Sequence, residues 1–129
     1  MKRVLVTRAF DRWCTLGSAV LCRAAREVEA GRFEADLGRG LVKKRVAYPG
    51  RGKSGGARLL VAWGNSACLV FIVGRDKSDP GADFSAAQVE SAKELAVAFA
   101  RLDSHQLGVA LLRGAVKEIH CGEEVSSAR

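Results

Sequence analysis

Residues 39–75 read RGLVKKRVAYPGRGKSGGARLLVAWGNSACLVFIVGR. Eight Lys or Arg residues fall in this stretch, and no Asp or Glu occurs between Asp36 and Asp76. The whole chain has a formal net charge of +7, so the remaining residues, with thirteen bases and fourteen acids, sum to −1. A patch of cations this concentrated indicates a polyanionic partner, because neutralising phosphates releases condensed counterions.

The cations of this stretch are interleaved with apolar residues, which is typical of a strand rather than of a solvated helix face. Alternation over Leu41 to Ala47 places Lys43 and Arg45 on one face of a strand. Lys44 is expected on the opposite face. The cations of this strand should therefore divide between the two faces of a sheet.

Two further strands follow in the same stretch. Arg58 to Trp63 and Cys68 to Val73 are apolar runs joined by Gly64-Asn65-Ser66, which is a hairpin signal. Tyr48 to Gly56 is too rich in glycine for a helix or a strand, so we expect a flexible hairpin loop there. Leu37 to Leu41 carries two glycines and is interpreted as the turn into the sheet. Together these elements predict an antiparallel meander.

Outward from the meander, the amino-terminal part predicts one strand and two helices. Arg3 to Thr7 has the composition of a short strand, and Phe10 to Cys14 has helical spacing. Ser18 is expected to cap a second helix with one apolar stripe, and Gly31 to end it.

The carboxy-terminal part predicts two helices and an edge strand. After a loop over Asp76 to Asp83, Ser85 and Gln88 match a capping box, so a helix should begin there. A shorter helical piece is expected over Leu107 to Leu112, and Val116 to Ile119 should return as an edge strand. The predicted class is therefore α+β.

Length and composition indicate the number of domains, the cellular compartment and the state of the cysteines. A chain of 129 residues with 48% apolar and 27% charged residues is expected to form one domain, residues 1–129, with a disordered tail after about residue 121. No apolar run is long enough for a signal peptide or a membrane span, so we expect a cytoplasmic protein. The four cysteines, at positions 14, 22, 68 and 121, lack metal-ligand spacing, so we expect four reduced, mostly buried thiols.

Gly52-Lys53-Ser54 has the ending of a phosphate-binding loop of nucleotide hydrolases. The first glycine of that motif would fall at Ala47, and no helix is expected to follow the loop. A nucleotide-hydrolysing site is therefore not favoured. The loop can still hold a single phosphate of RNA through Lys53 and its glycine amides.

The central block resembles a known family. Gly40 to Ala47, GLVKKRVA, followed by Gly50 to Arg58, GRGKSGGAR, is similar to the G-x-x-K-x-R-x-A and G-x-G-K-S-G-G-x-R block of RelE/HigB-like toxins of bacterial toxin–antitoxin systems. The similarity extends to Phe10-Asp11-Arg12-Trp13 and to Lys93-Glu94-Leu95-Ala96. It implies a RelE-like microbial ribonuclease fold, with amino-terminal helices packed on a small antiparallel sheet and a carboxy-terminal helix.

The resemblance also implies an activity. Such a toxin is an mRNA endoribonuclease that needs neither metal nor cofactor, depends on the ribosome and inhibits translation. We expect a 2′-hydroxyl to attack the adjacent phosphate while arginines stabilise the developing charge. Lys43 is our first choice of general base and Lys53 the second, because a lysine can accept a proton only in its neutral form and neighbouring cations such as Arg45 favour that form.

The expected site has two sets of residues. The catalytic set is Lys43, Arg45, Lys53, Arg58 and Arg75. The RNA-binding set is Lys44, Tyr48, Arg51, Ser54, Phe71 and Lys77, in which the two aromatic residues would stack on bases. His105 and His120 lie outside the basic block and are not expected to take part in catalysis. No metal ligand is expected.

The implied partners are mRNA, the 70S ribosome and a cognate antitoxin, expected to be a HigA-like helix-turn-helix protein, and no membrane. The sequence departs from the family where Phe71 takes a tyrosine position and Ser78 a basic one. Two alternatives therefore stay open: a nucleic-acid-binding module without catalysis, and a ParE-type inhibitor of DNA gyrase.

Overall fold

The computed structural model describes residues 2–50, 55–78 and 83–122. Its elements follow in the order β1 Arg3–Thr7, α1 Arg8–Trp13, α2 Ser18–Glu29, β2 Ala35–Gly38, β3 Leu41–Ala47, β4 Gly56–Ala62, β5 Cys68–Asp76, α3 Ala86–Ala100, α4 Ser104–Leu112 and β6 Val116–Ile119. The expected α+β class is confirmed. The strands expected over 3–7, 41–47 and 116–119 have the predicted bounds.

The six strands form one sheet in the order β2-β3-β4-β5-β1-β6. The expected meander is present, since β3, β4 and β5 pair antiparallel in sequence order. One feature differs from the expected antiparallel sheet, because β1 pairs with β5 in parallel. The sheet is therefore mixed, and β1 separates the meander from the edge strand β6.

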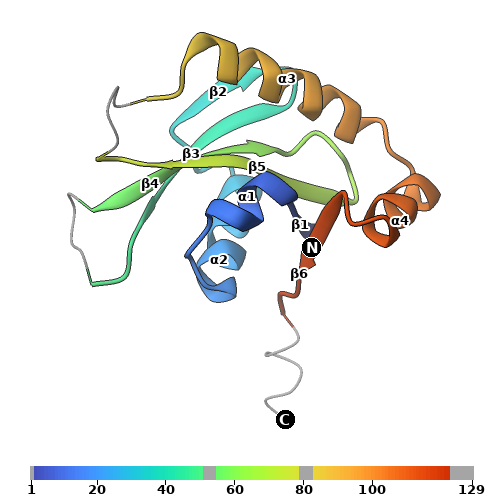
Figure 1. Cartoon of the computed structure of the whole chain (residues 1–129), viewed down its shortest axis with the longest axis horizontal. Helices are drawn as coiled ribbons and strands as arrows, with labels where there is room; N and C mark the ends of the chain where they lie inside the picture. Colours follow the sequence, from blue (N-terminus) through green and yellow to red (C-terminus); the bar gives the residue numbers. More distant parts are fainter. Residues whose placement is uncertain (1, 51–54, 79–82, 123–129) are drawn as a thin grey trace.

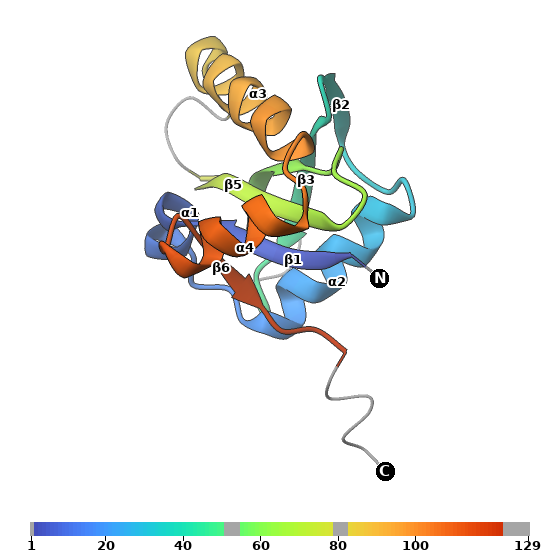
Figure 2. The ribbon, with the colours of Figure 1, turned by 90° about the vertical axis from the view of Figure 1, so that its right-hand side faces the viewer.

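Both faces of the sheet are covered. In Figures 1 and 2, α3 lies across one face, and α1 and α2 lie on the other. We call these the α3 face and the α2 face. The α2 face is built around Val6, Phe10 and Phe71, and the α3 face around Leu5, Leu60 and Leu107; all six are buried. The burial of apolar area on both faces is the main driving force for this arrangement.

A β-bulge in β5 changes which face its side chains point to. The register of β4 against β5 shifts between Leu60 and Val61, so that Leu60 opposes Val73 while Val61 opposes Phe71. Ile72 is the extra residue, and both Ile72 and Val73 belong to the core of the α3 face. A bulge of this kind interrupts the alternation of side chains. Residues after Val73 therefore point to the face opposite to the one that simple alternation predicts.

The strand β2 was not predicted, because Gly38 and Gly40 made residues 37–41 resemble a turn. The turn is shorter than expected and lies between β2 and β3, where Gly38, Arg39 and Gly40 all have positive φ. Glycine adopts this conformation without a steric cost, which explains the two glycines. Ala35 and Asp36 before the turn pair with β3 and form one edge of the sheet.

The predicted start of α3 is confirmed, the predicted cap of α2 is not, and the helix expected over Leu107 to Leu112 begins earlier, at Ser104. The hydroxyl of Ser85 accepts from the backbone N–H of Gln88, and the Gln88 side chain accepts from the N–H of Ser85, so the predicted capping box is present. Ser18 was expected to cap α2, but it is the first helical residue and Gly17 is the N-cap. Gly31, with a φ of 85°, follows the end of α2 as predicted.

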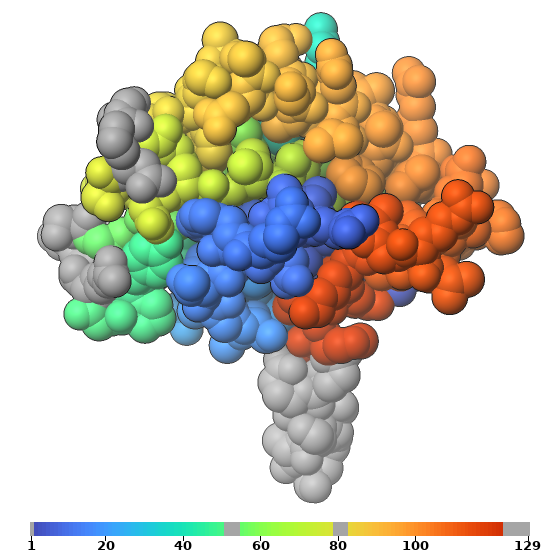
Figure 3. Space-filling view, in the orientation of Figure 1, coloured from blue at the N-terminus to red at the C-terminus, as the bar shows by residue number. Residues whose placement is uncertain are grey.

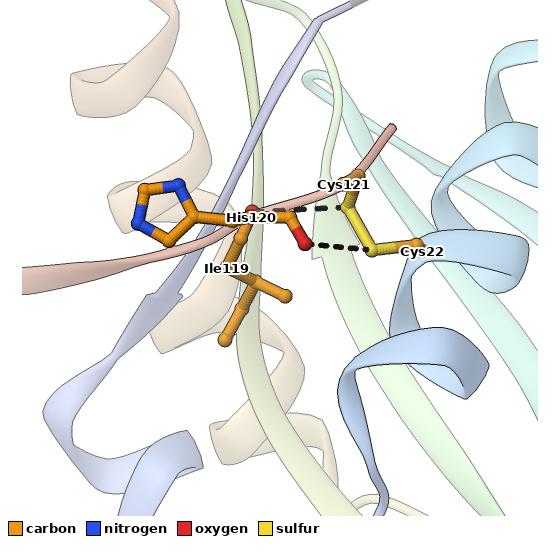
Figure 4. The surroundings of a disulfide bond; sticks show 4 residues. All are labelled: Cys22, Ile119, His120 and Cys121. Carbon is orange, nitrogen blue, oxygen red and sulfur yellow. Dashed lines mark hydrogen bonds between the residues drawn. A yellow bond between two sulfur atoms is a disulfide. The ribbon is translucent and has the colours of Figure 1, made fainter. Parts of the chain in front are cut away.

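The prediction of four reduced cysteines was wrong for two of them. Cys22 in α2 and Cys121 after β6 form a disulfide between residues 99 positions apart, with a Cα–Cα distance of 5.7 Å. Figure 4 shows the bond joining α2 to the end of the described chain, with the His120 ring directed away from it. Local sequence spacing could not reveal this pair, because only the fold brings the two segments together. Cys14 and Cys68 are free thiols, and burial raises the pKa of both.

No helix in the described part of the chain is long and apolar enough to cross a bilayer. The tail expected after about residue 121 falls mostly outside the described residues, as do positions 51–54 of the predicted glycine-rich loop. Within the described ranges, no group of three or more His, Cys, Asp or Glu side chains is placed to hold a metal ion.

Candidate nucleic-acid interface

Three arginines lie side by side on neighbouring strands, near one end of β3, β4 and β5. Arg45 in β3 is directly opposite Arg58 in β4, and Arg58 is directly opposite Arg75 in β5. Directly opposed residues of antiparallel strands share a face. We call this set the arginine row. It lies on the α3 face, because Arg75 donates a hydrogen bond to the backbone carbonyl of Asp83, just before α3.

The bulge in β5 is what places Arg75 in the row. Simple alternation would put residues 71 and 75 on one face, but the extra residue sends Phe71 to the α2 face and Arg75 to the α3 face. In Figures 1 and 3 the ends of β3, β4 and β5 that carry the row lie together at the left edge of the molecule.

Lys43 adds a fourth cation to this face. It lies two residues before Arg45 in the same strand, so it points the same way, as the alternation predicted. Its Nζ donates a hydrogen bond of 2.7 Å to Oδ2 of Asp83, and its side chain is 16% exposed. The hydrogen bond from Lys43 holds the pKa of the Asp83 carboxyl below its ordinary value, with a smaller contribution from the charge of Arg58. The Asp83 carboxyl is therefore ionised at neutral pH.

The three arginines differ in their surroundings. Arg58, with 17% of its side chain exposed, has a guanidinium nitrogen 3.4 Å from a carboxylate oxygen of Glu34. Arg45 is exposed. With Lys77, Arg45 borders a hollow of about 200 Å³ over the ends of β3 and β4, whose other lining residues are Val46, Ala47, Gly55, Gly56 and Ala57. Arg45, the exposed arginine of the row, therefore also lies beside the hollow.

Two residues of the expected RNA-binding set, Lys44 and Phe71, are buried in this structure. Lys44 points to the α2 face, as predicted from alternation, but it is buried there and its Nζ lies 2.7 Å from Glu27 in α2. Phe71 is fully buried and stacks on Phe10 at 5.4 Å between ring centroids, so it offers no surface to a base. Local periodicity did not reveal this burial, because the stacking of Phe71 on Phe10 joins two segments that are distant in sequence.

Tyr48 does not join the arginine row. It packs against the core of the α2 face, and its hydroxyl donates a hydrogen bond to the carboxylate of Asp76. The side chain is half-buried, so stacking on RNA stays a prediction for this residue. Arg51, Lys53 and Ser54 lie outside the described residues, and their expected roles stay predictions as well.

The predicted site did not include two carboxylates that the fold brings to this face, those of Glu34 and Asp83. Each contacts one of the cations, although 24 and 40 residues separate the members of the two pairs. His105 and His120 belong to α4 and to the segment after β6, so they lie toward the other end of the strand order.

In chemical terms, this face can bind and stabilise anionic oxygens. Guanidinium groups match the geometry of phosphate oxygens and keep their charge at all working pH values. Four cations on one face of three adjacent strands could therefore contact neighbouring phosphates, or several oxygens of one phosphate. Lys43 acts here as a hydrogen-bond donor, so a role as proton acceptor would require its release from Asp83.

Comparison with known proteins supports the same interpretation. A family model described as "RelE toxin of RelE / RelB toxin-antitoxin system" matches residues 2–119. The matched range runs from just before β1 to the end of β6, so it contains every helix and strand of the described fold. No curated protein matches the chain.

Proposed function

This chain belongs to the RelE toxin family, as the toxin of a toxin–antitoxin system, and on that premise we propose that it is a metal-independent endoribonuclease that cleaves mRNA and inhibits translation. The observation that carries the proposal is the arginine row with Lys43 on the same face. Positive charge gathered on one face suits a substrate with closely spaced phosphates.

In the proposed reaction, a ribose 2′-oxygen of the RNA attacks the adjacent phosphorus and displaces the 5′-oxygen of the next nucleotide. A base takes the 2′-hydroxyl proton, and an acid protonates the leaving oxygen. Arg58 and Arg75 stabilise the charge that develops on the phosphoryl oxygens, and Arg45 binds a neighbouring phosphate. The products are a 2′,3′-cyclic phosphate and a 5′-hydroxyl end.

Lys43 is the first choice for the base once substrate has separated it from Asp83, and Lys53 stays the second. We place the reaction in the cytoplasm, on mRNA held in the 70S ribosome, where the ribosome presents an extended strand to the row. The antitoxin partner that the family implies is proposed to be a HigA-like helix-turn-helix protein. It would neutralise the toxin by covering the arginine row or by preventing access to the ribosome.

The proposal is tested by inducing the wild type, Arg58→Ala and Arg58→Lys in a bacterium while growth is followed and mRNA 5′ ends are mapped. Arg113→Ala is the matched control, because Arg113 is an exposed arginine at the end of α4, away from the row. We expect growth arrest and new mRNA ends for the wild type and the control. Arg58→Ala should abolish both, and Arg58→Lys should restore little because lysine lacks the planar fork.

Protein that has been treated with EDTA and then freed of the chelator should still cleave mRNA on ribosomes as the untreated protein does. Arrest without new mRNA ends, together with inhibited DNA supercoiling, would support the gyrase-directed alternative instead. RNA binding that depends on Arg58 but leads to no cleavage would support the other alternative, a nucleic-acid-binding module without catalysis.

A further inference from the structure

Asp83 occupies a position on the α3 face that is suited to an anion. Its Oδ2 accepts a hydrogen bond of 2.7 Å from Lys43, and its backbone carbonyl accepts one from Arg75. The positive charge of Arg58 also acts on this carboxylate. A carboxylate oxygen and a phosphate oxygen are alike as acceptors, since each carries negative charge and each takes short hydrogen bonds from cations.

The carboxylate is not needed to hold α3 in place. The first turn of α3 is capped by Ser85 and Gln88, which satisfy each other's backbone N–H groups. The contact between Arg75 and Asp83 uses the backbone carbonyl of Asp83, so it does not depend on the side chain. The remaining carboxylate contact is with the N–H of the next residue, Phe84. The side chain is 42% exposed, so little burial opposes its displacement.

We propose that Asp83 is an internal competitor for the phosphate-binding position at Lys43, which an RNA phosphate must displace before Lys43 can contact the substrate. This inference rests on the proposed function for the identity of the ligand, a ribonucleotide phosphate. The competition lowers the affinity of the free toxin for RNA, and it keeps Lys43 paired until a suitably placed phosphate arrives.

The test compares Asp83→Asn with Asp11→Asn in the full chain. Asp11 is a matched control, because its side chain is 46% exposed and lies 3.6 Å from Lys117, yet it belongs to α1 on the opposite face. The probe is a 2′-O-methyl RNA oligonucleotide, which binds but lacks the hydroxyl needed for cleavage. Fluorescence anisotropy over a series of salt concentrations gives affinity and the number of ions released.

Asp83→Asn is expected to bind the oligonucleotide about twofold to fivefold more tightly than the wild type, the range that corresponds to an exposed ion pair. The dependence of log affinity on log salt should steepen by about 0.7, as for one more neutralised phosphate on a single strand. Asp11→Asn should change the RNA affinity and its salt dependence less than Asp83→Asn does. Equal effects of the two variants, weaker binding by Asp83→Asn, or failure of Asp83→Asn to fold by circular dichroism would each overturn the inference.

A second measurement separates this inference from the proposed function. Inorganic phosphate is titrated into both proteins while the Lys43 side-chain amine is followed by NMR. If the Lys43 signal of Asp83→Asn responds at a lower phosphate concentration than that of the wild type, internal competition is supported. This holds even if neither protein binds RNA, in which case only the proposed function fails. If the wild type cleaves RNA while phosphate acts equally on both proteins, the inference alone fails.

Discussion

Arg58 and Arg75 occupy directly opposed positions on β4 and β5, so a cross-strand pair of the sheet consists of two like charges. Such pairs destabilise a sheet relative to neutral ones. Arg45 extends the unfavourable arrangement to a third strand. Neighbouring groups relieve it in part, since Glu34 lies near Arg58 and the Asp83 carbonyl accepts from Arg75. A charge arrangement that costs stability is typical of a functional site.

Arg45→Gln should therefore separate function from stability. Arg45 is exposed, so its replacement should leave the free energy of unfolding within about 0.5 kcal/mol of the wild type, or raise it slightly. RNA affinity should fall, with a shallower salt dependence. Urea unfolding and anisotropy check the two effects. Arg113→Gln is the control, and an equal loss of affinity in that variant would show that only net charge matters.

Gly74→Ala should destabilise the fold by about 1–3 kcal/mol, because a methyl group would overpack the core. A Cβ at position 74 would lie 2.2 Å from the nearest ring carbon of Trp13. Trp13→Leu should recover part of the loss, so the double variant should be more stable than the sum of the single effects predicts. Urea unfolding of all four proteins gives this coupling, and strict additivity would contradict the contact.

Asn65→Ala should cost about 1–3 kcal/mol, because it removes three side-chain hydrogen bonds to partly buried backbone groups. The Asn65 amide donates to the carbonyls of Phe99 and Leu102 at the end of α3, and its oxygen accepts from Ala67 N–H. Thermal unfolding measures the effect. The neighbouring Ser66 is exposed, so Ser66→Ala should have little effect; comparable losses in both variants would argue against the role of Asn65 at the helix end.

Reduction of the disulfide should lower stability by about 2–4 kcal/mol, since it releases a constraint between residues 99 positions apart. The Cys121→Ser variant should unfold at the same urea concentration with and without dithiothreitol. The reduced wild type should unfold at a urea concentration close to that of the variant. A thiol count on the unfolded, unreduced protein provides the control, with two thiols expected from Cys14 and Cys68. A count of four in protein taken from the cytoplasm would mean that the bond does not form there.

Acid should weaken the fold through carboxylates that are paired with cations. A hydrogen bond from Lys44 lowers the pKa of Glu27 from its ordinary value, and one from Arg3 does the same for Glu118. A depressed folded-state pKa contributes stability that is fully present above the unfolded-state value and is lost as the pH falls through the folded-state value. Unfolding midpoints in urea should therefore be constant near pH 6 to 7 and fall below about pH 4.5.

Glu27→Gln is the control for this pH dependence. It should be less stable than the wild type at pH 7, because the buried Lys44 loses its carboxylate partner and keeps only the Arg32 carbonyl, and it should lose less stability on acidification. Identical pH profiles for the two proteins would show that the pair between Glu27 and Lys44 does not govern acid stability.

Local patterns in the sequence predicted most of the elements, and contacts between distant segments account for the errors. Alternation placed Lys43 and Lys44 on opposite faces, and the capping box marked the start of α3; both are properties of a few neighbouring residues. The parallel pairing of β1 with β5 and the disulfide join residues far apart in sequence. The same is true of the approach of Asp83 to Lys43. No local periodicity carries that information.

The bulge in β5 has a consequence for how members of this family are compared. Phe71 and Arg75 are four positions apart and yet lie on opposite faces, because Ile72 and Val73 share one face. In a relative whose strand is shorter by one residue at this point, the arginine would face α2, even though the aligned residue types were the same. Gaps in an alignment of this strand therefore matter more than substitutions, since an insertion or deletion of one residue decides whether the arginine joins the cations of the α3 face or points into the core of the α2 face.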